Sequence, residues 1–124
     1  MGISDRFLEE HAKAMNGETF IIPSYLAVGS ADVDSISNAA TTLSDEIGTR
    51  VAMTGSRTDN TLKISAIRSG TAVIDTVNGD DITQSGAHGT LAGSDLLVSA
   101  IHNGVTQTTN FDLETEYTLG WDRR

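Results

Sequence analysis

The chain has 124 residues, no cysteine, one proline and a formal net charge of −9 at pH 7. This length suits one compact domain, and the lack of cysteine excludes disulfide frameworks, thiolate metal sites and thiol nucleophiles. The 17 acidic residues outnumber 8 Lys and Arg residues, so the chain offers no basic footprint. We therefore expect binding neither to nucleic acid nor to anionic membranes.

The acidic residues are dispersed along the whole chain, and only Lys13 and Lys63 are lysines. A dispersed acidic surface that is poor in lysine keeps a protein soluble in concentrated salt, where charge repulsion is screened. We therefore favour a halophilic source over an ordinary acidic protein. No apolar run approaches the roughly 20 residues of a membrane span, and the first residues lack the pattern of a signal peptide. We expect synthesis in the host cytoplasm.

The pattern over residues 4–16 predicts one short helix, with Ser4 as its N-cap and Asn16-Gly17 as its stop. Apolar positions at helical spacing form one stripe: Phe7, Leu8, His11, Ala12 and Met15. The opposite face carries Glu9, Glu10 and Lys13. A helix this short is marginal alone in water, so the stripe must pack on its own domain or on a neighbouring subunit. These five residues are the candidate assembly interface.

After Gly17 the pattern changes to extended segments. Residues 20–28 are expected to be extended and interrupted by Pro23, and residues 29–44 to form a long connection with one helical turn around 37–41. Turn signals at Asp59-Asn60 and Asn78-Gly79 predict hairpins. The expected later strands are 50–54, 61–69, 71–77, 80–83, 96–101, 105–113 and a last strand whose Tyr117, Leu119 and Trp121 face the core.

Two further stretches are predicted to be irregular: a loop rich in glycine and serine over residues 85–95, and a turn at His102-Asn103-Gly104. Short β-branched strands with turn signals every 8–12 residues or so are typical of antiparallel sandwiches and barrels. We therefore predict an all-β fold, an antiparallel and jelly-roll-like β-sandwich with one short N-terminal α-helix. The expected division is a docking helix over residues 1–17 and a single β-sandwich domain over residues 18–124.

A search for reactive constellations finds none. His11, His88 and His102 show no spacing typical of a zinc site, and no acid near His88 in the sequence has a useful spacing. Asp32 and Asp34 alternate like calcium ligands, but the rest of an EF-hand loop is missing. No nucleophile elbow or phosphate-binding glycine motif is present. We expect no catalytic, cofactor-binding or metal-binding residues, no cofactor and no enzymatic activity.

Four segments in a fixed order carry a family resemblance. They are Ile22-Pro23-Ser24-Tyr25-Leu26-Ala27-Val28-Gly29, Leu43-Ser44-Asp45-Glu46-Ile47-Gly48-Thr49-Arg50, Leu96-Leu97 after a glycine-rich loop, and Val105-Thr106-Gln107-Thr108-Thr109 followed by Tyr117-Thr118-Leu119-Gly120-Trp121. This order resembles small virion proteins of tailed bacteriophages and tailed archaeal viruses. In those proteins a P-x-x-[IL]-A-[LIV]-G strand precedes an L-x-x-E-[IV]-x-x-R element. The chain departs from the family pattern at residues 87–92 and at Gln107, where Lys is usual.

The resemblance implies a structural virion protein that assembles as a homo-oligomer with copies of itself and with other virion proteins. Suitable places are a capsid turret or decoration, a neck or collar, or a tail-fibre or baseplate attachment module. A charge of −9 would be repelled by packaged DNA, which favours the outside of the particle. The alternative is a β-sandwich module that binds a carbohydrate or another cell-surface ligand, for which Tyr25 is one of few aromatic candidates.

Glu46 and Arg50 form a candidate structural pair, because they lie four residues apart. They can pair across one helical turn, or reach separate backbone partners where a loop meets a strand. The resemblance implies that they organise the domain, without a catalytic role.

Overall fold

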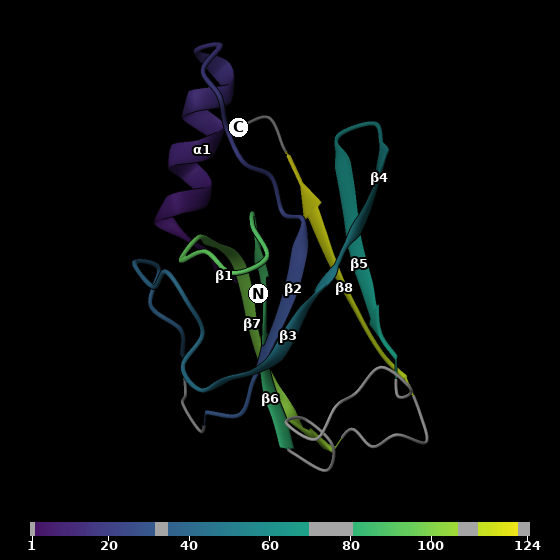
Figure 1. Cartoon of the computed structure of the whole chain (residues 1–124). Coiled ribbons are helices and arrows are strands. Elements are labelled where there is room, and N and C mark those ends of the chain that lie inside the picture. The colour runs from purple at the N-terminus through teal and green to yellow at the C-terminus, as the bar shows by residue number, and fades with distance from the viewer. Residues whose placement is uncertain (1, 32–34, 70–80, 107–111, 122–124) are drawn as a thin grey trace.

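The computed structural model describes residues 2–31, 35–69, 81–106 and 112–121. Its elements are β1 (Gly2–Ile3), α1 (Asp5–Met15), β2 (Tyr25–Gly29), β3 (Glu46–Ala52), β4 (Thr54–Thr58), β5 (Thr61–Arg68), β6 (Asp81–His88), β7 (Leu96–Thr106) and β8 (Leu113–Gly120). The strands form two antiparallel sheets, ordered β1-β7-β6-β2-β3 and β4-β5-β8 (Figure 1). The prediction of an all-β, sandwich-like fold with one N-terminal helix is confirmed.

The main core lies between the two sheets, because alternate residues of each strand point to the same face. The five-stranded sheet contributes Leu26, Val28, Ile82, Ala87, Leu97 and Val98, and the three-stranded sheet contributes Ile64, Ala66, Tyr117 and Leu119. A second, smaller cluster forms on the other face of β2, where Ala27 packs with Leu43 and Leu96. The connection after β2 therefore covers the outer face of the larger sheet.

The two sheets are joined along one side by almost continuous chain. β3 ends at Ala52 and β4 begins at Thr54, so one extended run is the edge of both sheets. The hairpin predicted at Asp59-Asn60 is present between β4 and β5, and Asp59 adopts a positive φ of 52°. Figure 1 shows this hairpin and α1 at the same end of the molecule, with the end of β8 between them.

Helix α1 begins and ends close to where the sequence predicts. The Ser4 side chain caps it by accepting a hydrogen bond from the amide of Phe7, and Gly17 follows its end with φ +75°. The Ser4 hydroxyl also donates to the carbonyl of Leu96 at 2.6 Å. Strand β1, which precedes the helix, pairs with β7. The segment expected to be a docking helix therefore also carries an edge strand that anchors it to the larger sheet.

Two predictions of local structure before β3 need adjustment, and two after β5 lie outside the described residues. The extended segment expected from residue 20 is a strand only over β2, because the chain before it is held by α1, where the Ile21 amide donates to Glu10 Oε2. The helical turn expected around residues 37–41 is a single hydrogen-bonded turn from the Ala40 amide to the Ser37 carbonyl. The strands expected within residues 71–77 and the turn at Asn78-Gly79 lie outside the described residues.

The predicted loop over residues 85–95 is wrong in its first half. Strand β6 runs through it to His88 and lies between β2 and β7 in the middle of the larger sheet. Gly86 allows close packing in this strand, because a Cβ at this position would lie 2.5 Å from Leu96 Cδ1 and 3.2 Å from Leu43 Cδ2. The turn predicted at residues 102–104 is also wrong, because β7 continues through it as far as Thr106.

We expect Gly86→Ala to lower the free energy of unfolding by about 1–3 kcal/mol, because an added methyl group overpacks the smaller cluster. Gly120→Ala is the matched control, since nothing lies within 4 Å of the Cβ position at this strand end. The control should leave stability unchanged or slightly raised. Urea denaturation at equal protein concentration measures both, and an unchanged midpoint for Gly86→Ala would contradict the packing described here.

Candidate functional site

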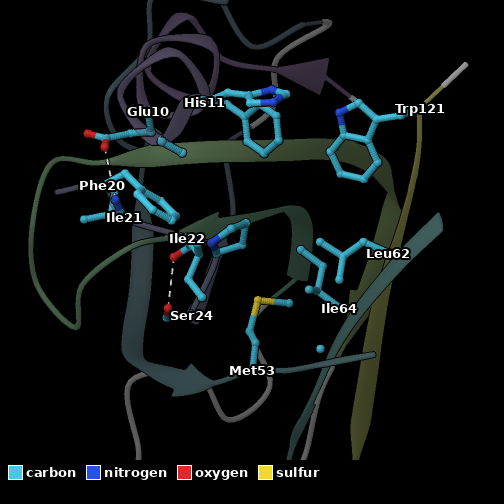
Figure 2. A pocket seen from close by; sticks show the side chains of 14 residues that line it. Glu10, His11, Phe20, Ile21, Ile22, Ser24, Met53, Leu62, Ile64 and Trp121 are labelled. Carbon is cyan, nitrogen blue, oxygen red and sulfur yellow. Dashed lines mark hydrogen bonds between the residues drawn. The ribbon is translucent and has the colours of Figure 1, made fainter. Parts of the chain in front are cut away.

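An apolar groove of about 340 Å³ opens at the end of the molecule where α1, the chain before β2 and the β4–β5 hairpin meet (Figure 2). Its apolar lining includes Phe7, Phe20, Ile22, Met53, Leu62 and Trp121. The groove exists because α1 does not lie across the open end of the sandwich but stands beside it. The inward edge of the core, at Leu62 and Ile64, forms its floor.

Two polar side chains in the groove, Glu10 and Ser24, are engaged by the protein itself. Glu10 Oε2 accepts a hydrogen bond from the Ile21 amide at 3.0 Å, and Ser24 Oγ donates to the Ile22 carbonyl at 2.9 Å (Figure 2). The His11 ring stacks edge-on against Trp121, with ring centroids 6.4 Å apart. What the groove presents to an occupant is therefore mainly hydrocarbon and aromatic surface.

Glu10 is a correction to the helix prediction, which places it on the solvent face. It is the buried residue of α1, with 4% of its surface exposed. Burial raises the pKa of its carboxyl, but hydrogen bonds from Arg6, the Ile21 amide and Lys13 outweigh burial and lower the pKa below its ordinary value. Glu10 thus fixes the helix to the chain before β2 and holds one wall of the groove.

The predicted apolar stripe faces outward. Phe7 is half-buried at the groove, whereas Leu8, His11, Ala12 and Met15 are exposed, Met15 by 79%. With about 100° per residue, Leu8 and Met15 lie roughly a quarter turn from Phe7, so the stripe continues the groove wall around the helix. Of the two alternatives for the stripe, packing on its own domain applies to Phe7 and, through the ring contact with Trp121, to His11.

Exposed apolar side chains gather around the groove. Besides the stripe they include Phe20, Ile22 and Trp121. Trp121 is expected from the sequence to be core and is instead 41% exposed, because it follows the end of β8 and leans toward the helix. We call these six residues, Leu8, His11, Met15, Phe20, Ile22 and Trp121, the apolar rim.

The other two residues of the last strand are core, as predicted. Tyr117 and Leu119 are both buried between the sheets. Burial raises the pKa of Tyr117 to about 12, and its hydroxyl donates to Ser85 Oγ at 2.5 Å.

Glu46 and Arg50 pair on β3, not across a helical turn. Residues four apart on a strand share a face, and the guanidinium meets the carboxylate with two bonds of 3.0 and 3.1 Å. Arg50 Nη1 also donates to the carbonyls of Thr90 and Gly93, at 3.0 and 2.8 Å. The expected pairing across a helical turn is therefore wrong, because both residues lie on a strand, where they still form the pair. The backbone contacts of Arg50 tie the connection between β6 and β7 to the edge of the sheet.

A buried charged cluster extends this pair, and the sequence gives no sign of it. His88 Nδ1 lies 3.1 Å from Asp95 Oδ1, which contradicts the expectation of no acid near His88. Asp95 accepts a further bond from Thr90 Oγ1 at 2.8 Å and lies 3.7 Å from Arg50 Nη1. The turn between β6 and β7 places Asp95 beside His88. The spacing of these two residues in the sequence does not predict this contact.

Within residues 2–31, 35–69, 81–106 and 112–121, no group of three or more metal-ligating side chains comes together. Asp32 and Asp34 lie outside those ranges. His102 is exposed and pairs with the carbonyl of its neighbour Asn103. In the same described parts of the chain, no helix has the length and apolar character needed to cross a bilayer. The chain matches no protein-family model, no curated protein and no solved structure.

Proposed function

We propose that the protein is a non-enzymatic assembly module, which forms homo-oligomers through the groove and the apolar rim. The observation that carries the proposal is that an apolar groove and five of the ten exposed large apolar side chains of the described residues belong to one region, the groove and its rim. These five are Leu8, Met15, Phe20, Ile22 and Trp121. Contiguous exposed apolar surface commonly marks an interaction site, because leaving it in water is unfavourable. The charge of −9 opposes non-specific association between copies, so a stable contact needs a matched apolar surface such as this one.

The particle on which it assembles is proposed from the family resemblance. The order of four sequence segments supports a structural virion protein of a tailed virus, in contact with other virion proteins. The acidic charge supports an outward position, as a capsid turret or decoration, a neck or collar element, or a tail-fibre or baseplate attachment module. The same charge supports a halophilic setting and argues against contact with nucleic acid or membrane.

A carbohydrate-binding module is the second candidate, favoured by the exposed aromatic edge of the groove at Trp121 and Phe20. Sugars stacked on an aromatic ring also need free hydrogen-bonding groups beside it. Glu10 and Ser24 are already engaged within the protein. An apolar occupant therefore fits the groove better than a saccharide.

Light scattering of the purified protein, at high and low salt, tests the assembly proposal. We expect a mass that is a multiple of 13.1 kDa. Antibodies raised against the protein should label the outside of intact virus particles from the source. A monomer under all conditions would contradict the assembly proposal, and specific binding of that monomer on a glycan array would favour the second candidate.

A further inference from the structure

The His88 side chain is enclosed on the outer face of the larger sheet, under the connection from β6 to β7. None of its surface is exposed. Its Nδ1 meets the Asp95 carboxylate at 3.1 Å, whereas its Nε2 has no hydrogen-bond partner among the described residues. This asymmetry determines whether the folded structure holds His88 in its neutral or in its charged form. We call the structure described here, with residues 89–95 against the sheet, the closed structure.

A neutral ring satisfies the geometry when its proton is on Nδ1, where it donates to Asp95 Oδ1. Nε2 then carries only a lone pair. Protonation would place an N–H at Nε2, buried and with no acceptor, and an unpaired buried donor of a charged group is strongly unfavourable. The closed structure therefore holds His88 neutral.

Three elements place charges around His88 and its partner Asp95. Arg50 and Glu46 act on His88 from β3, and Asp95 faces it from the turn before β7; Tyr25 is its register partner on β2. Arg6 of α1 interacts electrostatically with Asp95. Burial lowers the pKa of His88, and the Arg50 guanidinium lowers it further. Together they outweigh Asp95 and Glu46, which raise it.

We propose that His88 and Asp95 form an acid-released latch, which holds the connection over residues 89–95 against the sheet at neutral pH and frees it when His88 takes up a proton. In the open state the ring is hydrated and titrates near its ordinary pKa of about 6.5. Because the closed state does not bind the proton, its stability is complete above that pH and falls as the pH is lowered. The inference concerns the local fold and stands whether or not the assembly proposal is correct.

The latch also adjoins the groove. The carbonyl of His88 accepts the Ser24 amide at 2.8 Å. A Cβ on Gly89 would lie 2.5 Å from Ile21 Cδ1, so the backbone after His88 is pressed against the chain that lines the groove. Opening the latch therefore loosens one wall of the groove.

Amide hydrogen exchange at pH 8 and pH 5 tests the latch in the full chain. For a closed state that excludes the proton, the opening equilibrium increases about 30-fold between these values, after correction for the intrinsic exchange rates. We expect this increase at the amides of Gly93, Ser24 and Leu96, which bond to Thr90 Oγ1, the His88 carbonyl and the Thr41 carbonyl. Amides of the β5–β8 ladder should change much less.

His88→Asn should remove the acid response, because the amide keeps an N–H donor near the Nδ1 position and does not titrate. The matched control is His102→Asn, which alters an exposed imidazole and should retain the response. In the unaltered protein, nitrogen-resolved NMR should show His88 neutral and protonated at Nδ1 at pH 6, below the ordinary histidine pKa of about 6.5. Equal acid response in His88→Asn, or a His88 ring that is charged at pH 6 while hydrogen exchange shows the latch closed, would overturn the proposal.

Discussion

Arg50→Ala is expected to lower the free energy of unfolding by about 3–5 kcal/mol, the range found when one partner of a buried ion pair is removed. The side chain of Arg50 is 4% exposed and serves four groups: the Glu46 carboxylate, the carbonyls of Thr90 and Gly93, and the nearby Asp95. Truncation leaves the buried Asp95 carboxylate and the partly exposed Glu46 carboxylate without their cation. Urea denaturation gives the midpoint, and the slope shows whether unfolding remains one transition.

Arg57→Ala is the control, because Arg57 is exposed and donates only to the carbonyl of Asp59 among the described contacts. Its effect should stay within about 0.5 kcal/mol. Arg50→Lys should recover only part of the loss, since an ammonium cannot reproduce the two-pronged contact with Glu46. A loss below about 1 kcal/mol for Arg50→Ala would show that the cluster does not organise the domain.

Ile22→Glu is expected to weaken self-association by about 100-fold or more, because it places a carboxylate where the proposed interface excludes water. Ile22 is 58% exposed at the mouth of the groove, so the substitution should leave the fold intact. Sedimentation velocity over a dilution series measures the association, and circular dichroism checks the fold.

Ile67→Glu provides a matched control for chemistry and exposure. Ile67 is 56% exposed, but it lies on the outer face of β5, away from the groove. The Ile67→Glu variant should associate as strongly as the unaltered protein. If both substitutions weaken association equally, the effect is one of added charge and the groove is not the interface. If neither does, the interface lies elsewhere.

The fold class could be read from the sequence because local signals were strong. The Ser4 cap, Asn16-Gly17 and the Asp59-Asn60 turn each determine backbone geometry through neighbouring residues, and all three are present. The strand expected over residues 80–83 is the first half of β6, but its continuation to His88 could not be recognised, because glycine and serine are typical of loops. Gly86 must be small in β6, because an added Cβ would collide with the side chain of Leu96 and crowd that of Leu43. The sequence does not indicate these neighbours.

The candidate surface was predicted in part. The five stripe residues were identified from helical periodicity, but periodicity cannot say which face a helix turns toward its own domain. Glu10 fixes the orientation of the helix, because its carboxylate accepts a hydrogen bond from the Ile21 amide. This contact depends on the path of the chain before β2. The fold adds three residues from outside the helix to this surface, and helical periodicity does not indicate them: Phe20, Ile22 and Trp121.

The charged cluster was beyond sequence reasoning for a related cause. The spacing of Glu46 and Arg50 indicated a pair, but Arg50 also bonds to carbonyls 40 and 43 residues away. Every residue has a backbone carbonyl, so the residue types in the sequence do not indicate which carbonyls Arg50 contacts. Only the position of β3 beside the turn after β6 brings them into reach.

Hydroxyl-radical footprinting across a dilution series tests most directly whether the groove end is the surface through which copies assemble. In the dissociated protein Met15 and Trp121 should react readily, since both are exposed. On assembly we predict that Met15, Phe20 and Trp121 become protected, while Leu91 and Ile67, exposed elsewhere, keep their reactivity. Association that leaves the reactivity of Met15 and Trp121 unchanged would contradict the account.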